Sequence, residues 1–194
     1  LLHSREEWIR LLGLRETNST ARRRGYMLYL VTPEAAAMWR SVRRLAKQLK
    51  APLHVYCFVG TTALLNWRRH PVRQLVSTLA KRVLLFTAGV RLHFTATPTD
   101  FVQSVMDCEG LFTDSFHGMM FATLFGKKCN VVIGEHPERQ QMSARLRNFV
   151  ADFGNPEIVT PTFAPEALRT LAISKKLQEL IDTSKKWLAK ALQA

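Results

Sequence analysis

Short continuous apolar runs alternate along the chain with longer segments in which apolar residues return every three or four positions. The runs are of strand length and lack the alternation of a half-exposed strand, which is typical of strands buried on both faces of a parallel sheet. They lie at residues 25–31, 53–59, 91–97, 110–113 and 129–133. The stretch 83–86 fits either the end of a helix or a further short strand.

The periodic segments predict helices. They lie at residues 5–12, 35–50, 71–82, 98–108, 119–125 and 143–153, and a last helix carries a stripe of Leu177, Leu180, Ile181, Trp187, Leu188 and Leu192. Thr32 before Pro33 is a predicted helix start, and Thr99 or Asp100 is the predicted cap of the helix at 98–108. Gly126 is the predicted C′ residue of the apolar helix at 119–125.

Strand and helix alternate about every 25–30 residues, which predicts an α/β fold with a Rossmann-like parallel sheet and helices on both faces. Ligands of such folds bind beyond the carboxyl ends of the strands, where the strand order reverses. We therefore expect functional residues in the loops that follow strands. These loops are 32–35, 60–70, 97–101, 113–118 and 134–142.

The composition agrees with a globular chain that can bury a proper core. The chain has 194 residues, of which 47% are hydrophobic, and no apolar run approaches the length of a membrane helix. Its first residue is not Met and no signal-peptide pattern follows, which suggests a fragment or a processed chain. Cys57, Cys108 and Cys129 lie within apolar segments, and we interpret them as small core residues of a reducing compartment.

The net charge of +13 is the one extreme value, and it is typical of proteins that meet nucleic acid, anionic lipid or phosphorylated substrates. The first fifty residues hold 11 basic and 4 acidic side chains. Much of the excess comes from the cluster at 22–24 and from a helical face of Arg40, Arg43, Arg44 and Lys47, which we interpret first as a solvated basic face.

The densest candidate site is the segment 113–118, Thr-Asp-Ser-Phe-His-Gly, between a predicted strand and an apolar helix. Unpaired N–H groups at a helix N-terminus favour phosphate or carboxylate. Ser115 could cap the helix or donate to an anion, and His117 could transfer a proton or contact phosphate. Gly118 would allow close approach of a ligand or of neighbouring backbone. An ordinary helix cap with a buried histidine explains the segment equally well.

The other candidates are weaker. His54 and His93 lie in strands and are better explained as core or edge residues, and His70 and His136 lie in loops. No spacing typical of a metal site, a dinucleotide-binding loop or a P-loop is present, so we expect no metal and no cofactor. Arg145 and Arg147 open the helix predicted after residue 142, where a guanidinium could bind a carboxylate through two hydrogen bonds.

Residues 98–132 resemble the core of the polysaccharide pyruvyl transferase family. That family carries a Pro-x-x-Phe helix, an apolar strand, a Thr-Asp-Ser/Arg-Phe-His-Gly turn, an apolar helix and Gly-Lys. The matching residues are Pro98, Phe101, Thr113, Asp114, Ser115, Phe116, His117, Gly118, Phe121, Gly126 and Lys127. Ser143-Ala144-Arg145 is similar to the family's Ser-Arg segment, with an alanine inserted. The likeness is specific over 110–128 and loose over the rest of residues 1–155.

The resemblance implies one Rossmann-like lobe of a two-lobed GT-B-type transferase. Residues 1–155 would be its donor-binding C-terminal lobe, 156–194 a helical extension, and the N-terminal lobe would be missing. The donor would be phosphoenolpyruvate, and the acceptor a hydroxyl pair of a glycan or lipid-linked sugar. The resemblance makes His117 the acid or the contact of the leaving phosphate. It makes Ser115 and the amides of 115–118, including Phe116 and Gly118, the phosphate site. Asp114 becomes the helix cap and Arg145 the anion clamp.

Three alternatives remain. A GT-B glycosyltransferase with a nucleotide-sugar donor, similar to sialyltransferases, would need a ribose-binding acid, for which Glu135 is the candidate. A basic nucleic-acid-binding module would place aromatic residues among the arginines, and only Trp39 and Trp67 hint at this, so nucleic acid is the disfavoured partner. The lobe could also be inert by itself. We expect a cytoplasmic location and peripheral contact with a membrane.

Overall fold

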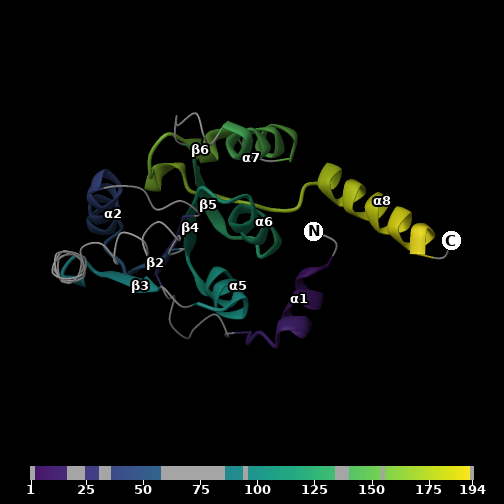
Figure 1. Ribbon diagram of the computed structural model, residues 1–194, viewed down its shortest axis with the longest axis horizontal. Helices are drawn as coiled ribbons and strands as arrows, with labels where there is room; N and C mark the ends of the chain where they lie inside the picture. Colours follow the sequence, from purple (N-terminus) through teal and green to yellow (C-terminus); the bar gives the residue numbers. More distant parts are fainter. Residues whose placement is uncertain are drawn as a thin grey trace, which may run out of the picture.

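The computed structural model describes residues 3–16, 25–30, 36–57, 86–93, 96–133, 140–153 and 156–192, and all structural statements refer to these (Figure 1). Their strands are β1 (Tyr26–Leu30), β2 (Leu53–Cys57), β3 (Val90–His93), β4 (Gly110–Thr113), β5 (Lys128–Val132), β6 (Val159–Thr160) and β7 (Arg169–Thr170). Their α-helices are α1 (Arg5–Leu12), α2 (Ala36–Leu49), α5 (Pro98–Asp107), α6 (Phe116–Leu124), α7 (Gln140–Phe153) and α8 (Lys175–Leu192).

The described strands form a single sheet in the order β3-β2-β1-β4-β5-β6, and all neighbours along this path are parallel. β7 pairs with β5 in the antiparallel direction. The order 3-2-1-4-5-6 is that of a doubly wound Rossmann-like sheet, whose direction of winding reverses between β1 and β4. The predicted α/β fold is therefore confirmed.

Helices cover both faces of the sheet, with α2 on one side and α5 and α6 on the other (Figure 1). Each face has its own apolar cluster, in line with strands that are buried on both sides. Leu45 of α2 packs with Leu28 and Val55 of the sheet, whereas Val105 of α5 and Met119 of α6 pack with Leu111. All four residues of β4 are buried, which explains why this strand reads as an uninterrupted apolar run.

Capping residues set the ends of two helices on the α5–α6 side. Ser4 and Glu7 form a reciprocal capping box at the start of α1, and Gly13 ends that helix with a positive φ. Thr97 makes the same kind of box with Asp100 at the start of α5. The predicted cap at Thr99 or Asp100 is therefore wrong, and β3 ends at His93, before the predicted end at Thr97. Thr97 can cap because it lies directly before Pro98 in an extended conformation.

The helix α6 begins at Phe116, three residues before the predicted start. Its C-terminus follows the prediction: Gly126 lies at φ 63°, and Lys127 N–H donates to Ala122 C=O at 2.8 Å. This pair of features is the Schellman ending that a glycine at C′ favours. Most of α6 is buried, as its uniform apolarity predicts.

The segment after α7 belongs to the sheet. The side chain of Asn130 in β5, fully buried, donates to Ile158 C=O and Thr160 Oγ1, each at 2.8 Å, and accepts from Ala164 N–H at 3.1 Å. With β6 and β7 paired to β5, the sheet extends past residue 155. The segment predicted as a helical extension thus also supplies two strands to the sheet. The sequence gives no sign of them, because two-residue strands carry no periodic signal.

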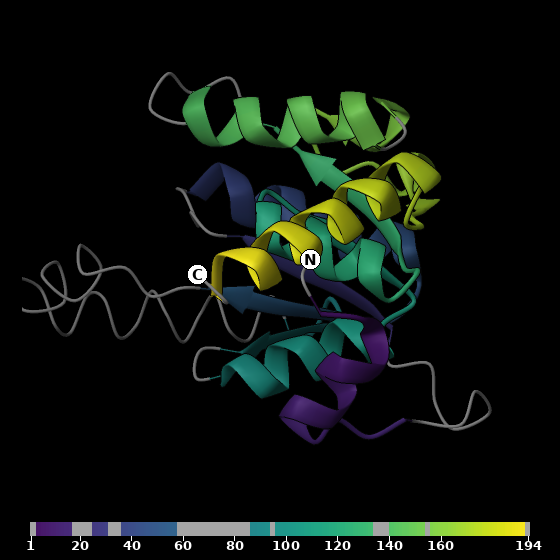
Figure 2. The same cartoon turned by 90° about the vertical axis from the view of Figure 1, so that its right-hand side faces the viewer.

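The C-terminal helix α8 projects from the rest of the molecule (Figure 1). Seen from the side, it crosses obliquely in front of the layer that contains α6 (Figure 2). Leu177 and Ile181 are its buried residues. None of the described helices combines the length and apolarity needed to cross a bilayer.

Several sequence predictions fall outside the described residues. They are the helix start at 32–34, the end of the second strand at 58–59, the loop 60–70 with Trp67 and His70, the helix 71–82, the arginines 22–24, and Glu135 with His136.

Candidate functional site

The turn between β4 and α6 lies at the carboxyl edge of the sheet, at the reversal point between β1 and β4. Thr113 closes β4, and its Oγ1 donates to Tyr29 C=O of the neighbouring β1 at 2.8 Å. The same Oγ1 accepts from Ser115 N–H at 3.0 Å, which turns the chain immediately after the strand. The Thr113 side chain thus links β1 and β4 to the turn through hydrogen bonds. The sequence analysis had assigned it no separate role.

Ser115 is the N-cap of α6. Its Oγ accepts from Gly118 N–H at 3.4 Å, and only 3% of the residue is exposed. The predicted cap at Asp114 is wrong, because Asp114 lies one residue too early to reach the third amide of the helix. The predicted phosphate site also has fewer available amides, since the N–H groups of Ser115 and Gly118 already donate to acceptors inside the turn. No described group accepts from the N–H of Phe116 or His117.

Gly118 is required by packing between parts of the chain itself. A Cβ at this position would lie 2.7 Å from Thr113 Oγ1 and 3.3 Å from the Tyr29 ring. The first turn of α6 therefore rests directly on the ends of β4 and β1. The sequence analysis explained this glycine by the close approach of either a ligand or neighbouring protein. The structure shows the close approach of neighbouring protein atoms.

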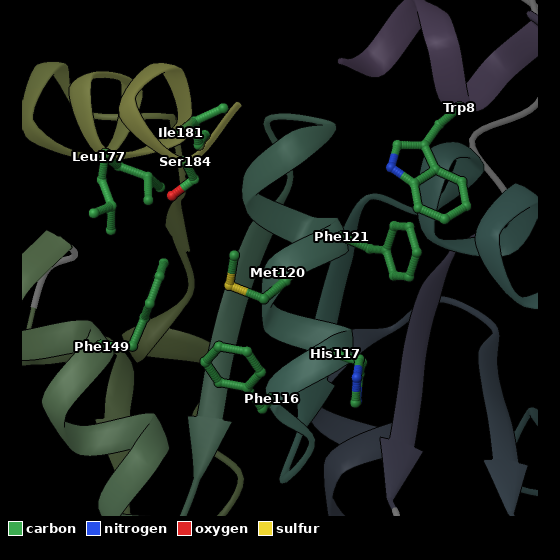
Figure 3. A pocket seen from close by; sticks show the side chains of 10 residues that line it. Trp8, Phe116, His117, Met120, Phe121, Phe149, Leu177, Ile181 and Ser184 are labelled. Atoms are coloured by element: carbon green, nitrogen blue, oxygen red, sulfur yellow. The ribbon is translucent and has the colours of Figure 1, made fainter. Parts of the chain in front are cut away.

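His117 is exposed in the first turn of α6, while Phe116 beside it is half-buried. The two rings meet edge-on, with their centroids 6.2 Å apart (Figure 3). Phe116 packs edge-on against Phe149 of α7, with ring centroids 5.6 Å apart. Phe116 is thus a packing residue that joins two helices, and His117 is the ionisable side chain that the turn presents to solvent.

Tyr29 brings a second titratable group to the same edge. Its ring packs against Phe101 of α5 with centroids 4.5 Å apart, and its carbonyl receives the Thr113 hydroxyl. Burial raises the pKa of Tyr29, and the negative charge of the half-buried Asp114 raises it further. The edge therefore holds a protonated phenol close to a carboxylate, an arrangement the sequence analysis did not predict.

Arg145 lies in the second turn of α7, because the helix begins at Gln140 and not at the predicted Ser143. Arg145 and Arg147 are both exposed. Arg145 is one helical turn before Phe149, on the same side of the helix. α7 follows a parallel strand and runs back along the sheet, so Arg145 is nearer to the carboxyl edge than Phe149 is. No ion pair between described residues joins Arg145 to the turn.

A groove of about 500 Å³ runs over the outer side of α6, with His117 at one end (Figure 3). Its lining is mostly aromatic and aliphatic and comes from α1, α6, α7 and α8: Trp8, Phe116, His117, Met120, Phe121, Phe149, Leu177, Leu180, Ile181 and Ser184. Trp8 packs edge-on against Phe121 at 5.2 Å, and its buried indole N–H has no acceptor among the described residues. Sequence reasoning missed this groove, because four helices from both ends and the middle of the chain form it.

A polar cluster joins β2 and β3 on the α5 side of the sheet. His54 Nδ1 and His93 Nε2 are 3.0 Å apart and share a hydrogen bond, and the Tyr56 ring stacks on His93 at 4.5 Å. The Tyr56 hydroxyl also bonds to Ser104 of α5. Burial lowers the pKa of His93, and the positive charge of Arg91 lowers it further. Both histidines are half-buried, in agreement with their predicted structural role.

The remaining candidates from the sequence are the cysteines, a metal site and the basic residues of α2. Cys108 and Cys129 are free and buried, as predicted, and burial raises the pKa of Cys108 to about 12. No three His, Cys, Asp or Glu side chains of the described residues lie close enough together to hold a metal ion. On α2, Arg40, Arg44 and Lys47 are exposed, as a solvated face requires, whereas Arg43 is half-buried.

Fold and turn together define an α/β protein of the Rossmann-like class, with a histidine-bearing strand-to-helix turn at the reversal point of its sheet. No model of a known protein family matches the chain, and no curated protein matches its sequence.

Proposed function

We propose that the chain is the donor-binding part of a transferase that moves the pyruvyl group of phosphoenolpyruvate to two hydroxyls of a sugar, as a ketal. One observation carries the proposal. The segment 113–118, in which the resemblance to pyruvyl transferases is most specific, forms the turn at the reversal point of the sheet and exposes His117 there. Ligands of doubly wound folds bind at this place.

The reaction sets clear demands on the site. One sugar hydroxyl adds to C2 of phosphoenolpyruvate while C3 takes up a proton, and the bond between C2 and the phosphate oxygen breaks. The second hydroxyl then bonds to C2 and completes the ketal. One hydroxyl proton is thereby moved to C3 and the other leaves with phosphate. The protein must bind two anionic groups, deliver one proton and stabilise the leaving phosphate.

The described residues can be matched to these demands. The amides of Phe116 and His117 open α6, where the helix carries a partial positive charge of about half a unit that favours phosphate. The His117 imidazole, exposed beside them, serves either as the proton donor to C3 or as a contact of the leaving phosphate. Arg145 on α7 is the candidate partner for the carboxylate. Ser115 and Gly118 shape the turn, because their polar groups bond to each other.

In this proposal the acceptor, a glycan or a lipid-linked sugar, is held against the turn by a second lobe. Donor binding is the part of the function that residues 1–194 are expected to carry by themselves. Phosphoenolpyruvate at ten times its dissociation constant should raise the melting temperature by about 3–5 °C. His117→Ala and Arg145→Ala should each reduce this rise, whereas Arg147→Ala, equally exposed on the same helix, should leave it unchanged.

The measurement is thermal denaturation of the full chain with phosphoenolpyruvate, inorganic phosphate or a set of nucleotide sugars. Phosphate alone should give a smaller rise, because it lacks the carboxylate that Arg145 is proposed to bind. A rise with nucleotide sugars and none with phosphoenolpyruvate would instead support the glycosyltransferase alternative. No rise with millimolar phosphoenolpyruvate would contradict a preformed donor site in this chain.

A further inference from the structure

The rest of the protein covers the apolar stripe of α8 along only part of the helix. Leu177 and Ile181, in the first half of the helix, are 3% and 9% exposed and pack onto the body. Leu180 is 50% exposed, and in the last turns Trp187 and Leu192 reach 70% and 79%. The stripe therefore continues beyond the point at which the protein covers it.

Helical periodicity places these exposed residues on one side of α8. At 100° per residue, Leu180, Trp187, Leu188 and Leu192 lie within an arc of about 140° that also contains Leu177 and Ile181. The arc is broader than isolated surface leucines would produce, and it ends on a tryptophan. Exposed apolar residues that gather in this way mark a contact surface, whereas single ones need no explanation.

The charges of α8 are divided along its length. The first half holds Lys175 and Lys176 together with Glu179 and Asp182, so its net charge is zero. The second half holds Lys185, Lys186 and Lys190, and no acidic residue follows Asp182 in the chain. On the helix, Lys185 lies at one edge of the apolar arc, whereas Lys190 and Lys186 lie on the opposite, polar side. The half of α8 with the most exposed apolar residues, Trp187 and Leu192, is thus also its basic half.

We propose that the second half of α8 is a docking surface for an anionic lipid bilayer. A basic amphipathic helix of this kind lies in the plane of the membrane interface, with tryptophan and leucine among the acyl chains and lysines at the headgroups. Tryptophan suits this boundary because its ring is apolar and its N–H is polar. Figure 1 shows this end of α8 directed away from the rest of the molecule, where a flat surface can reach it.

Charge favours a bilayer over a second copy of the chain. Each copy carries +13, so two copies meeting at their basic helix ends would repel each other, whereas an anionic surface attracts both the helix and the chain as a whole. The inference is independent of the proposed reaction, because it uses none of the residues at the β4–α6 turn and no substrate.

Vesicle flotation of the full chain tests the proposal. The probe is a set of phosphatidylcholine vesicles with and without about one-third phosphatidylglycerol, at about 0.15 M salt. The chain should float with the anionic vesicles and remain in solution with the neutral ones. Fluorescence of Trp187 should shift to shorter wavelength on binding, which a Trp187→Phe variant would identify as the signal of this residue.

Two variants and a matched control separate α8 from general charge. Trp187→Ser with Leu192→Ser should abolish flotation and leave the melting temperature unchanged, because both residues are exposed. Lys185→Gln, Lys186→Gln and Lys190→Gln together should weaken binding by about five-fold per lysine. Arg40→Gln, Arg44→Gln and Lys47→Gln remove the same charge from the exposed face of α2 and should change binding by less than about two-fold per residue.

Three results would overturn the proposal. The first is an equal loss of binding in the α2 and α8 charge variants, which would reduce the effect to net charge. The second is a dimer in light scattering that the Trp187→Ser, Leu192→Ser variant converts to monomer, because a second copy would then cover the stripe. The third is binding of an oligonucleotide that the α8 variants remove while vesicles fail to bind.

Discussion

Gly118 and Thr113 approach each other so closely that a methyl group on the glycine would lie 2.7 Å from the threonine Oγ1. The hydroxyl cannot move aside freely, because it donates to Tyr29 C=O and accepts from Ser115 N–H. The first turn of α6 therefore packs directly against the ends of β4 and β1. This packing fixes the position of His117, one residue before Gly118.

The first prediction concerns the contact between these two residues. Gly118→Ala should lower the free energy of unfolding by about 1–2 kcal/mol, because overpacking of about 1–3 kcal/mol exceeds the gain in helix propensity. Urea denaturation measures the change. In a Thr113→Ala background the same substitution should cost clearly less, since its main obstacle is gone. Equal costs in both backgrounds would show that the contact is not what excludes a side chain.

The second prediction concerns the hydrogen bonds that hold the segment after α7 to the sheet. Asn130→Leu keeps the number and branching of the side-chain heavy atoms but leaves Ile158 C=O and Ala164 N–H without their partner. The free energy of unfolding should fall by about 2–4 kcal/mol in urea denaturation. Thr160→Val removes one of the three hydrogen bonds of Asn130 and the exposed bond from Thr160 Oγ1 to Thr162 C=O, and should cost about 1 kcal/mol. A loss no larger for Asn130→Leu than for Thr160→Val would contradict the central role of Asn130.

The third prediction is a pH dependence of stability that arises at His93. Burial and the neighbouring Arg91 lower the pKa of His93 in the folded chain, so the unfolded chain binds its proton at higher pH. Stability should consequently fall as the pH is lowered below about 6.5, the ordinary value, and this contribution should be constant above it. Protonation of both partners would also place two cations at the contact between His54 and His93.

The urea midpoint at pH 7.5 and at pH 5.5 checks this sign. His93→Gln should reduce the difference between the two midpoints, because glutamine bonds to His54 without titrating. His3→Gln, at an exposed position on the chain, should leave the difference as it is. A pH dependence that is equally steep in the His93→Gln protein would assign it to other groups.

Local patterns predicted the class of the fold because strands buried on both faces are continuous apolar runs, as in β1 and β4. They also singled out residues 113–118, where a polar turn stands between two fully apolar elements. The residues alone offered Ser115 as a cap and the resemblance offered Asp114, and Ser115 makes the bond. Both residue types cap helices, so only the actual start of α6 distinguishes them. The same ambiguity affected Thr97 at the start of α5.

Other features have no local signal at all. The strands β6 and β7 are two residues long and contain threonine and arginine, so only their pairing with β5 identifies them. The groove over α6 depends on Trp8 near one end of the chain and Ile181 near the other, and their proximity is a property of tertiary packing. The raised pKa of Tyr29 likewise results from groups that the fold brings together across the sheet.

Helix α6 lies between the exposed His117 and the segment that leads to α8. Its N-terminus carries His117, whereas beyond its C-terminus Lys127 C=O accepts from Leu171 N–H at 3.0 Å, in the segment that leads to α8. Nine helical residues, about 13 Å of rigid rod, therefore separate the exposed histidine from the anchor of the terminal helix. If α8 docks on a bilayer as proposed, α6 would therefore set the distance between that bilayer and His117.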